Sequence, residues 1–136
     1  MDALSSIVKI AASGMRAQGE RLRVVSENVA NASTTAQKSG DEPYRRKVIS
    51  FGEMTDEATG AALVEVSDIT RDMGEFSLRF DPSHPAADDN GYVKLPNVNP
   101  LIEMSNMREA SRSYEANLTM LENAKQMRSE LINLIE

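Results

Sequence analysis

A heptad row of apolar residues runs along the first thirty residues and constrains the fold more than any other feature. Its positions alternate steps of four and three, and all but Gln18 are apolar: Leu4, Val8, Ala11, Met15, Gln18, Leu22, Val25, Val29 and Ala32. No Pro interrupts residues 3–32, which predicts one helix roughly 45 Å long with Asp2 as its N-cap. Such a helix is too long for the private core of a small globule, so its apolar edge needs a partner.

Two glycines lie inside this predicted helix, Gly14 and Gly19. Each costs about 1 kcal/mol relative to Ala in a helix interior, so a compensating interaction is expected. We therefore expect a neighbouring helix to approach closely at both positions.

A second long helix is predicted at the other end of the chain. Asn99 and Pro100 are typical of an N-cap and a first helical position, and Glu103 is favourably placed in the first turn. No Gly or Pro follows Pro100, so this helix can run to the terminus and reach roughly 50 Å. Its apolar positions follow a three-four rhythm that Asn117 and Arg128 interrupt: Met107, Ala110, Tyr114, Leu121, Ala124, Leu131 and Ile135.

The composition changes between the two helices, because residues 36–98 contain four of the five Pro and most of the Gly. Short segments rich in β-branched and aromatic residues predict strands at 44–51, 62–66 and 76–80. The predicted fold class is therefore mainly α with a small β insertion. The terminal helices, within 1–35 and 99–136, pair as one coiled-coil hairpin domain, and 36–98 form a central loop and β region.

Composition also excludes several functional classes. The absence of Cys rules out disulfides, thiolate metal sites and Cys nucleophiles, and a net charge of −6 argues against a nucleic-acid binder. No apolar run approaches the ~18 residues of a membrane span, and the start of the sequence lacks the basic region of a cleavable secretory signal. With only 4% aromatic residues, the core is expected to be small or shared between chains.

The candidates for chemistry have plainer explanations. Asp81, Ser83 and His84 are the residue types of a hydrolase triad, but folds and not sequence adjacency assemble triads, and we expect His84 to fix a turn. Asp88 and Asp89 lack the ligand spacing of an EF-hand. We therefore predict no catalytic, cofactor-binding or metal-binding residues, and no cofactor.

Two questions stay open at the level of the residues. The only basic run, Arg45, Arg46 and Lys47, fits either a salt-bridge site that faces a partner or a charged edge that discourages unwanted strand pairing. The apolar rows of the terminal helices fit either a hairpin within one molecule, as in a soluble adaptor or export chaperone, or a seam between molecules of an assembly.

Motifs at both ends resemble those of one family. The N-terminal motif comprises residues 12–18 (ASGMRAQ), Arg21, Leu22 and residues 26–34 (SENVANAST); the C-terminal motif comprises Glu103, Met104, Met107 and residues 110–117 (ASRSYEAN). Together they resemble the signatures of bacterial flagellar axial proteins, the rod and hook family. Residues 44–48, 81–88 and 91–100 are similar to the proximal rod members of that family.

The resemblance implies a structural subunit of the basal-body rod in the periplasmic space, without enzymatic activity. It implies export through the flagellar type III apparatus without a cleaved signal. The implied partners are other copies of the chain, rod proteins of the FlgB and FlgF types and a FliE-type adaptor, with no nucleic acid and no direct membrane insertion.

Two sets of site residues are predicted on this basis. We expect the assembly interface to include positions on both helices: Leu4, Val8, Met15, Leu22, Val25, Asn28, Val29, Asn31, Met107, Tyr114, Asn117, Leu121 and Leu131. We expect turn-forming residues to shape the linker into the second helix: Asp81, Pro82, His84, Pro85, Pro96 and Asn97.

Overall fold

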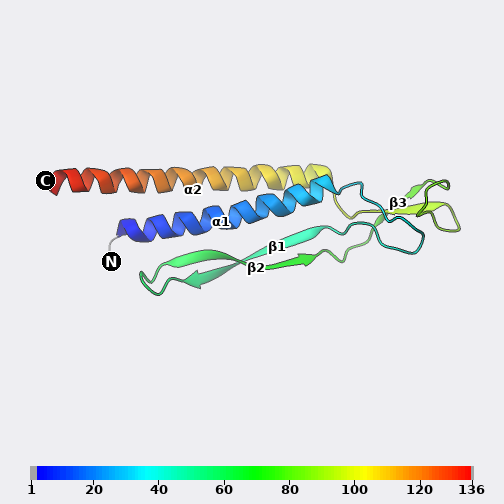
Figure 1. Cartoon of the computed structure of the whole chain (residues 1–136), viewed down its shortest axis with the longest axis horizontal. Coiled ribbons are helices and arrows are strands. Elements are labelled where there is room, and N and C mark those ends of the chain that lie inside the picture. Colours follow the sequence, from blue (N-terminus) through cyan, green and yellow to red (C-terminus); the bar gives the residue numbers. More distant parts are fainter. Residues whose placement is uncertain (1–2, 136) are drawn as a thin grey trace. The chain divides into compact units, whose positions relative to one another are not determined.

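The computed structural model describes residues 3–135. Its elements are, in chain order, α1 (Ala3–Ala30), β1 (Lys47–Thr55), β2 (Ala62–Arg71), β3 (Ser77–Phe80), β4 (Tyr92–Leu95) and α2 (Pro100–Ile135) (Figure 1). The strands form two two-stranded sheets, β1–β2 and β3–β4. The prediction of two terminal helices with a small antiparallel strand region between them is confirmed. Asp2, expected as the N-cap of α1, lies outside the described residues.

The chain divides into two compact units, each built from distant parts of the sequence. Unit 1 contains the residues up to Leu22, the segment Ile49–Asp68 and the residues from Arg108 onward. Unit 2 contains the segments Arg23–Val48 and Ile69–Met107. Each long helix therefore contributes one part to each unit.

The start of α2 is fixed by its cap, as predicted. Asn99 Oδ1 accepts a hydrogen bond from the Leu101 N–H at 3.0 Å, and the Asn99 carbonyl accepts one from the Glu103 N–H at 3.0 Å. Pro100 occupies the first helical position, where its missing N–H costs nothing.

The end of α1 comes two residues earlier than predicted, at Ala30. The Asn31 side chain bonds at this end: its Nδ2 donates to the Glu27 carbonyl at 2.8 Å, and its Oδ1 accepts from the Thr34 hydroxyl at 3.0 Å. The Glu27 carbonyl also accepts the helical bond from the Asn31 N–H at 3.0 Å, so the side chain adds a second bond to the last turn.

In unit 1 the two helices lie side by side and antiparallel (Figure 1). Gly14 lies against the Asn117 side chain, and Arg21 Nη2 donates to Glu109 Oε2 at 3.2 Å. Ile7 also faces α2, in a cavity whose other lining residues all belong to that helix. These three positions of α1 are seven residues apart, and we call them the contact row.

Each residue of the contact row directly precedes an apolar residue of the predicted heptad row. These apolar residues are Val8, Met15 and Leu22. They lie about 100° around the helix from the contact row and are half-buried. We call these three residues the flank row. Ala11, which belongs to the predicted row, is fully buried.

α2 packs closely on α1 at Gly14. A Cβ added to Gly14 would lie 2.7 Å from Nδ2 of Asn117, an atom already held by a 2.9 Å hydrogen bond to the Ser113 carbonyl. The expected close approach is therefore confirmed at Gly14. At Gly19 no atom from another part of the described chain lies within 4 Å of an added Cβ, so the chain's own second helix does not explain that glycine.

Alanine substitutions at the two glycines should have opposite effects on the full-length chain. Gly14→Ala should lower the free energy of unfolding by up to about 2 kcal/mol, because displacing the Asn117 side chain costs about 1–3 kcal/mol and the gain in helix propensity returns about 1 kcal/mol. Gly19→Ala should raise it by about 1 kcal/mol, because the helix gains propensity without a clash. Urea unfolding followed by circular dichroism measures both, and equal stabilities of the two variants would contradict this packing.

The β1–β2 hairpin of unit 1 is docked on α1 by polar contacts. The Val64 N–H donates to Ser13 Oγ at 3.2 Å, and Lys9 Nζ forms a 3.0 Å ion pair with Asp56 in the connecting loop. The hydroxyl of Thr59, together with Lys9, lowers the pKa of the Asp56 carboxyl. Leu63 supplies the buried apolar contact of this hairpin.

The observed strands differ from the predicted ones in length and number. β1 begins three residues later than predicted, and β1 and β2 extend to Thr55 and Arg71, through residues of low strand propensity such as Gly52 and Asp68, because the two strands pair with each other. β3 agrees with its prediction within one residue.

The fourth strand, β4, was missed by the sequence analysis. It is only four residues long and lies between the positive-φ Gly91 and Pro96, which are signals for turns. Pairing with β3 makes it a strand, with Phe80 opposite Tyr92 and their rings edge to face at 5.3 Å.

Candidate functional site

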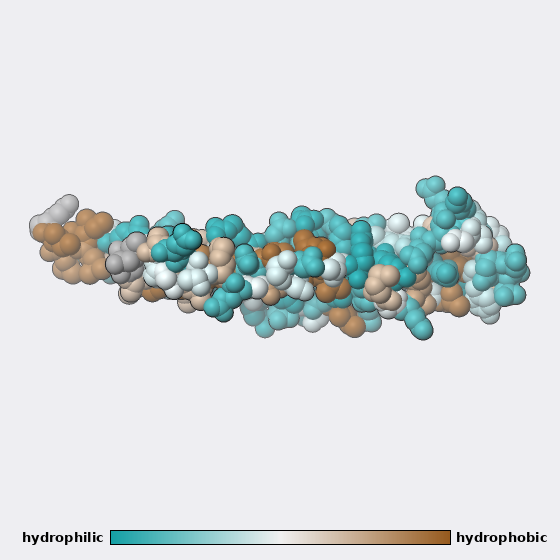
Figure 2. All heavy atoms as spheres, turned by 90° about the horizontal axis from the view of Figure 1, so that it is seen from below, coloured by the Kyte–Doolittle hydropathy of each residue, from teal (hydrophilic) through white to brown (hydrophobic). Residues whose placement is uncertain are grey.

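The most exposed apolar side chains of the described residues are concentrated on α2, whereas α1 has a single large one, Ile10, at 40% exposure. On α2, nine of them are 50–85% exposed: Leu101, Ile102, Met104, Met120, Met127, Leu131, Ile132, Leu134 and Ile135. Figure 2 shows the continuous apolar surface at the C-terminal end of this helix. Contiguous apolar patches on a soluble protein mark interaction surfaces.

In unit 1, the first turns of α1 and the C-terminal half of α2 line two apolar hollows. Ile7 and α2 residues from Ala116 to Met127 line a cavity of about 270 Å³, and Leu4, Met127, Glu130, Leu131 and Leu134 line another of about 340 Å³. Convergent charged groups are absent from both, since Glu130 is the only ionisable residue among the lining residues. These hollows therefore suit apolar side chains of another protein better than a polar substrate.

A buried polar cluster occupies unit 2, where the end of α1, the start of β1 and the start of α2 meet. We call its five members Asn28, Tyr44, Arg46, Lys47 and Glu103 the junction cluster. Asn28 and Glu103 are each only 1% exposed. Polar groups this deeply buried are stable only when they are hydrogen-bonded.

Asn28 makes the connections of the junction cluster. Its Oδ1 accepts from the Tyr44 hydroxyl at 2.7 Å and from the Lys47 N–H at 2.9 Å. Its Nδ2 donates to the Lys47 carbonyl at 2.9 Å and to Glu103 Oε2 at 3.4 Å. Burial raises the pKa of the Tyr44 hydroxyl, which keeps it a donor over the physiological range.

The charges of the basic run are neutralised inside the chain. Arg46 Nε donates to the buried carboxylate of Glu103, and Lys47 Nζ donates to Glu27 at 2.5 Å, which lowers the pKa of the Glu27 carboxyl. Arg45 pairs with Glu42 and lies 4.2 Å from the centre of the Phe76 ring. The three cations therefore have carboxylate partners in their own chain, which neither interpretation of the sequence, a partner-facing site or an edge-protecting run, had included.

Asn97 and the neighbouring linker residues also bond within unit 2. Asn97 Oδ1 accepts from the Arg46 N–H at 2.8 Å and its Nδ2 donates to the Asp72 carbonyl at 2.8 Å. Pro96 is buried and Pro82 and Pro85 are exposed.

Asp81, Ser83 and His84, the residue types of a hydrolase triad, are not arranged as a catalytic triad. The Ser83 hydroxyl donates to Asp81 at 3.1 Å, but His84 Nδ1 accepts from the Ala86 N–H at 2.9 Å and its Nε2 lies 3.2 Å from the Thr35 hydroxyl. His84 therefore has no contact with Ser83 that would activate a nucleophile.

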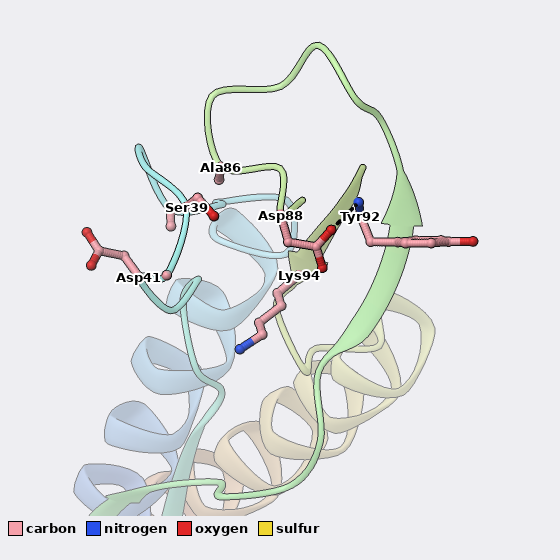
Figure 3. Close-up of a pocket in the computed structure, with 8 residues that line it drawn as sticks. Ser39, Asp41, Ala86, Asp88, Tyr92 and Lys94 are labelled. Carbon is pink, nitrogen blue, oxygen red and sulfur yellow. Dashed lines mark hydrogen bonds between the residues drawn. The ribbon is translucent and has the colours of Figure 1, made fainter. Parts of the chain in front are cut away.

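A hollow of about 230 Å³ in unit 2 is lined by polar groups that do not converge. In Figure 3 the Asp41 carboxylate and the Tyr92 ring point away from it. The Asp88 carboxylate accepts backbone N–H bonds from Asn90 and Tyr92, both at 2.9 Å. Within residues 3–135, no three acidic or histidine side chains are grouped to hold a metal ion.

The predicted interface residues fall into three groups. Val25 and Asn28 are buried, at 4% and 1% exposure, and Leu131 is 52% exposed. The others are half-buried: Leu4, Val8, Met15, Leu22, Val29, Asn31, Met107, Tyr114, Asn117 and Leu121. The expectation that Asn28 contacts another subunit needs correction, because its amide is used completely inside its own chain.

The site is thus a surface of two long helices, and it defines a structural protein that associates with other proteins through apolar helix faces. Two family models match the chain: the flagella basal body rod protein model over residues 9–36, and the C-terminal model of flagellar basal body rod FlgEFG proteins over residues 89–134. The first match covers most of α1, and the second covers β4 and nearly all of α2.

Relatives similar to the whole chain specify the family further. The chain is 48% identical to the flagellar basal-body rod protein FlgC of Agrobacterium fabrum, covering 100% of this chain and 98% of that protein. Identity to FlgC of Salmonella typhimurium is 40%, with 97% and 98% covered, and to FlgC of Bacillus subtilis 38%, with 88% and 90% covered. The chain belongs to the FlgC family of flagellar basal-body rod proteins.

The chain is therefore a structural subunit of the flagellar basal-body rod, where it assembles with other rod components, and it is not an enzyme. Within the described residues, neither helix is apolar enough over sufficient length to span a membrane.

Proposed function

We propose that this rod subunit polymerises through α1 and α2 into the proximal rod and transmits motor torque toward the hook and filament. The observation that carries the proposal is the flank row. Its apolar side chains Val8, Met15 and Leu22 lie beside the contact row, which meets the chain's own α2, and they are not fully buried by their own chain. Together with the exposed apolar face of α2, the flank row gives the subunit two surfaces, so one subunit can contact two neighbours.

Gly19 supports the same arrangement. It lies one turn beyond Met15 in α1 and has no close neighbour from another part of the described chain. Because a helix-interior Gly is unfavourable, we expect a helix of a neighbouring subunit to approach α1 at this point. Heterologous contacts that do not close into a ring generate a helical filament.

Within each subunit, we propose that α1 and α2 form a coiled-coil pair. The seven-residue spacing of the contact row, Ile7, Gly14 and Arg21, supports this pairing. Torque would then pass through packed helix faces, which resist shear because protein interiors are close-packed.

The neighbours, the position and the export route of the subunit are proposed from the resemblance of its motifs to the rod and hook family. We propose rod proteins of the FlgB and FlgF types and a FliE-type adaptor as neighbours, a periplasmic position and export through the flagellar type III apparatus. We also propose that the turn bonds of Asp81 and His84, and the Asn97 bonds to Arg46 and Asp72, shape the linker into α2 together with Pro82, Pro85 and Pro96.

Cysteine cross-linking tests the flank row, because the natural chain has no Cys. Cells carrying Met15→Cys and a second Cys at an exposed apolar position of α2, such as Met120→Cys, should yield disulfide-linked subunits in purified basal bodies. The matched control pairs Ser13→Cys, which is 2% exposed and faces Val64 of its own chain, with the same α2 change. Equal yields of linked subunits from both pairs, or none from the Met15 pair, would refute the proposed seam.

A further inference from the structure

The junction cluster joins three segments of unit 2 through one side chain. Asn28 lies seven residues beyond Arg21, so it continues the contact row of α1. Its partner on α2 is Glu103, and its other partners are Tyr44 and the main chain of Lys47. We propose that Asn28 is a register-determining residue, which fixes where α1, β1 and α2 meet in a single arrangement.

Apolar heptad positions alone do not select one register, because they repeat every seven residues. In unit 1, Gly14 against Asn117 and the Arg21–Glu109 ion pair favour the observed register, and in unit 2 Asn28 bonds to Glu103. A single buried Asn at a seam position is a documented way to select one register, because in every other register its polar groups lose their partners.

The hydrogen-bonding pattern of Asn28 makes the selection strict. Both the N–H and the carbonyl of Lys47 bond to the Asn28 amide, each at 2.9 Å, so the side chain replaces a neighbouring strand for this residue. Glu103 is 1% exposed and also accepts from Arg46, whose N–H donates to Asn97. A displaced α1 would leave the buried Glu103 carboxylate and the Tyr44 hydroxyl without the Asn28 amide.

The cluster lies entirely within one chain, so this inference does not depend on the proposed polymerisation. Its functional consequence is uniformity: subunits with two registers would present two different helix surfaces to their neighbours. A rod built from heterologous contacts needs every copy to present the same surface.

Distances between spin labels test the register directly. Ser26 and Ser105 are exposed residues of α1 and α2 within unit 2, and labels at Ser26→Cys and Ser105→Cys attach nowhere else in a chain without Cys. Double electron–electron resonance on the full-length chain should give one narrow distance. A broad distribution of distances would overturn the proposal, because the junction cluster is expected to fix one register of α1 and α2 within every chain.

The decisive variant replaces both buried partners, Asn28→Leu with Glu103→Leu. We expect it to stay helical by circular dichroism but to gain a second distance population, from an axial displacement of about 10 Å, the rise of seven helical residues. The matched control is Val24→Ala, which removes buried apolar volume one turn earlier and should lower the melting temperature without a second population. One native distance in the double variant would overturn the proposal.

A second variant covers the case in which the double variant loses its helices. Asn28→Asp has the same shape and keeps both acceptor bonds, but it loses the donor bonds to the Lys47 carbonyl and Glu103. We expect its native distance population to fall below that of the unchanged chain. A narrow native distance together with an unchanged melting temperature in Asn28→Asp would contradict a register role for the amide.

Discussion

Leu22→Asp should abolish incorporation of the subunit into the rod and leave cells non-motile, while the amount of the protein stays unchanged. Leu22 belongs to the flank row, which is half-buried in the subunit by itself. An added carboxylate costs little there as long as water reaches it, but it would be buried without a partner once a neighbouring helix covers the row. The defect should therefore appear at assembly and not at folding.

Three measurements separate these stages. Immunoblotting gives the protein level. The free energy of unfolding of the purified chain, measured in urea, should change by less than about 1 kcal/mol. Swimming assays and basal-body purification report assembly. Leu22→Met is the matched control at the same position, because this apolar swap keeps the volume and should preserve motility. Motile cells carrying Leu22→Asp would remove the flank row from the interface.

The displacement between the predicted row and the contact row shows what periodicity can and cannot establish. Apolar spacing correctly predicted a long amphipathic helix in residues 3–30. The same spacing placed Val8, Met15 and Leu22 in the predicted interface, because a pattern of apolar residues cannot include a glycine or an arginine. Yet Gly14 and Arg21 also meet α2, Gly14 against the Asn117 side chain and Arg21 through an ion pair with Glu109.

The caps were predictable because they are local, whereas the junction cluster was not. The sequence indicated Asn99 and Pro100 as the start of α2, and their bonds lie within four residues. Glu103 was assigned to the helix dipole, but its main partners, Arg46 and Asn28, are 57 and 75 residues away. The sequence offered one sign of the junction cluster. Asn28 is a polar residue seven positions beyond Arg21 in a helix with a heptad repeat.

The largest effect on folding stability is expected from Arg46→Leu. The Glu103 carboxylate is 1% exposed, whereas the Arg46 side chain is 25% exposed, so the substitution leaves a buried charge without its cation. Breaking a buried pair from one side costs about 3–5 kcal/mol, because the desolvation of the remaining ion is no longer offset. Urea unfolding of the full-length chain, followed by circular dichroism, should show this loss.

Two comparisons identify the buried charge as the cause. Adding Glu103→Leu to Arg46→Leu should restore most of the lost stability, because an apolar pair of similar volume has no charge to desolvate. Arg79→Leu should cost no more than about 1 kcal/mol, since Arg79 is 52% exposed and its nearest carboxylate, on Asp81, is 3.9 Å away. If Arg46→Leu were no more destabilising than Arg79→Leu, the Arg46–Glu103 pair would not stabilise the fold, and the junction cluster would then be held by the Asn28 amide alone.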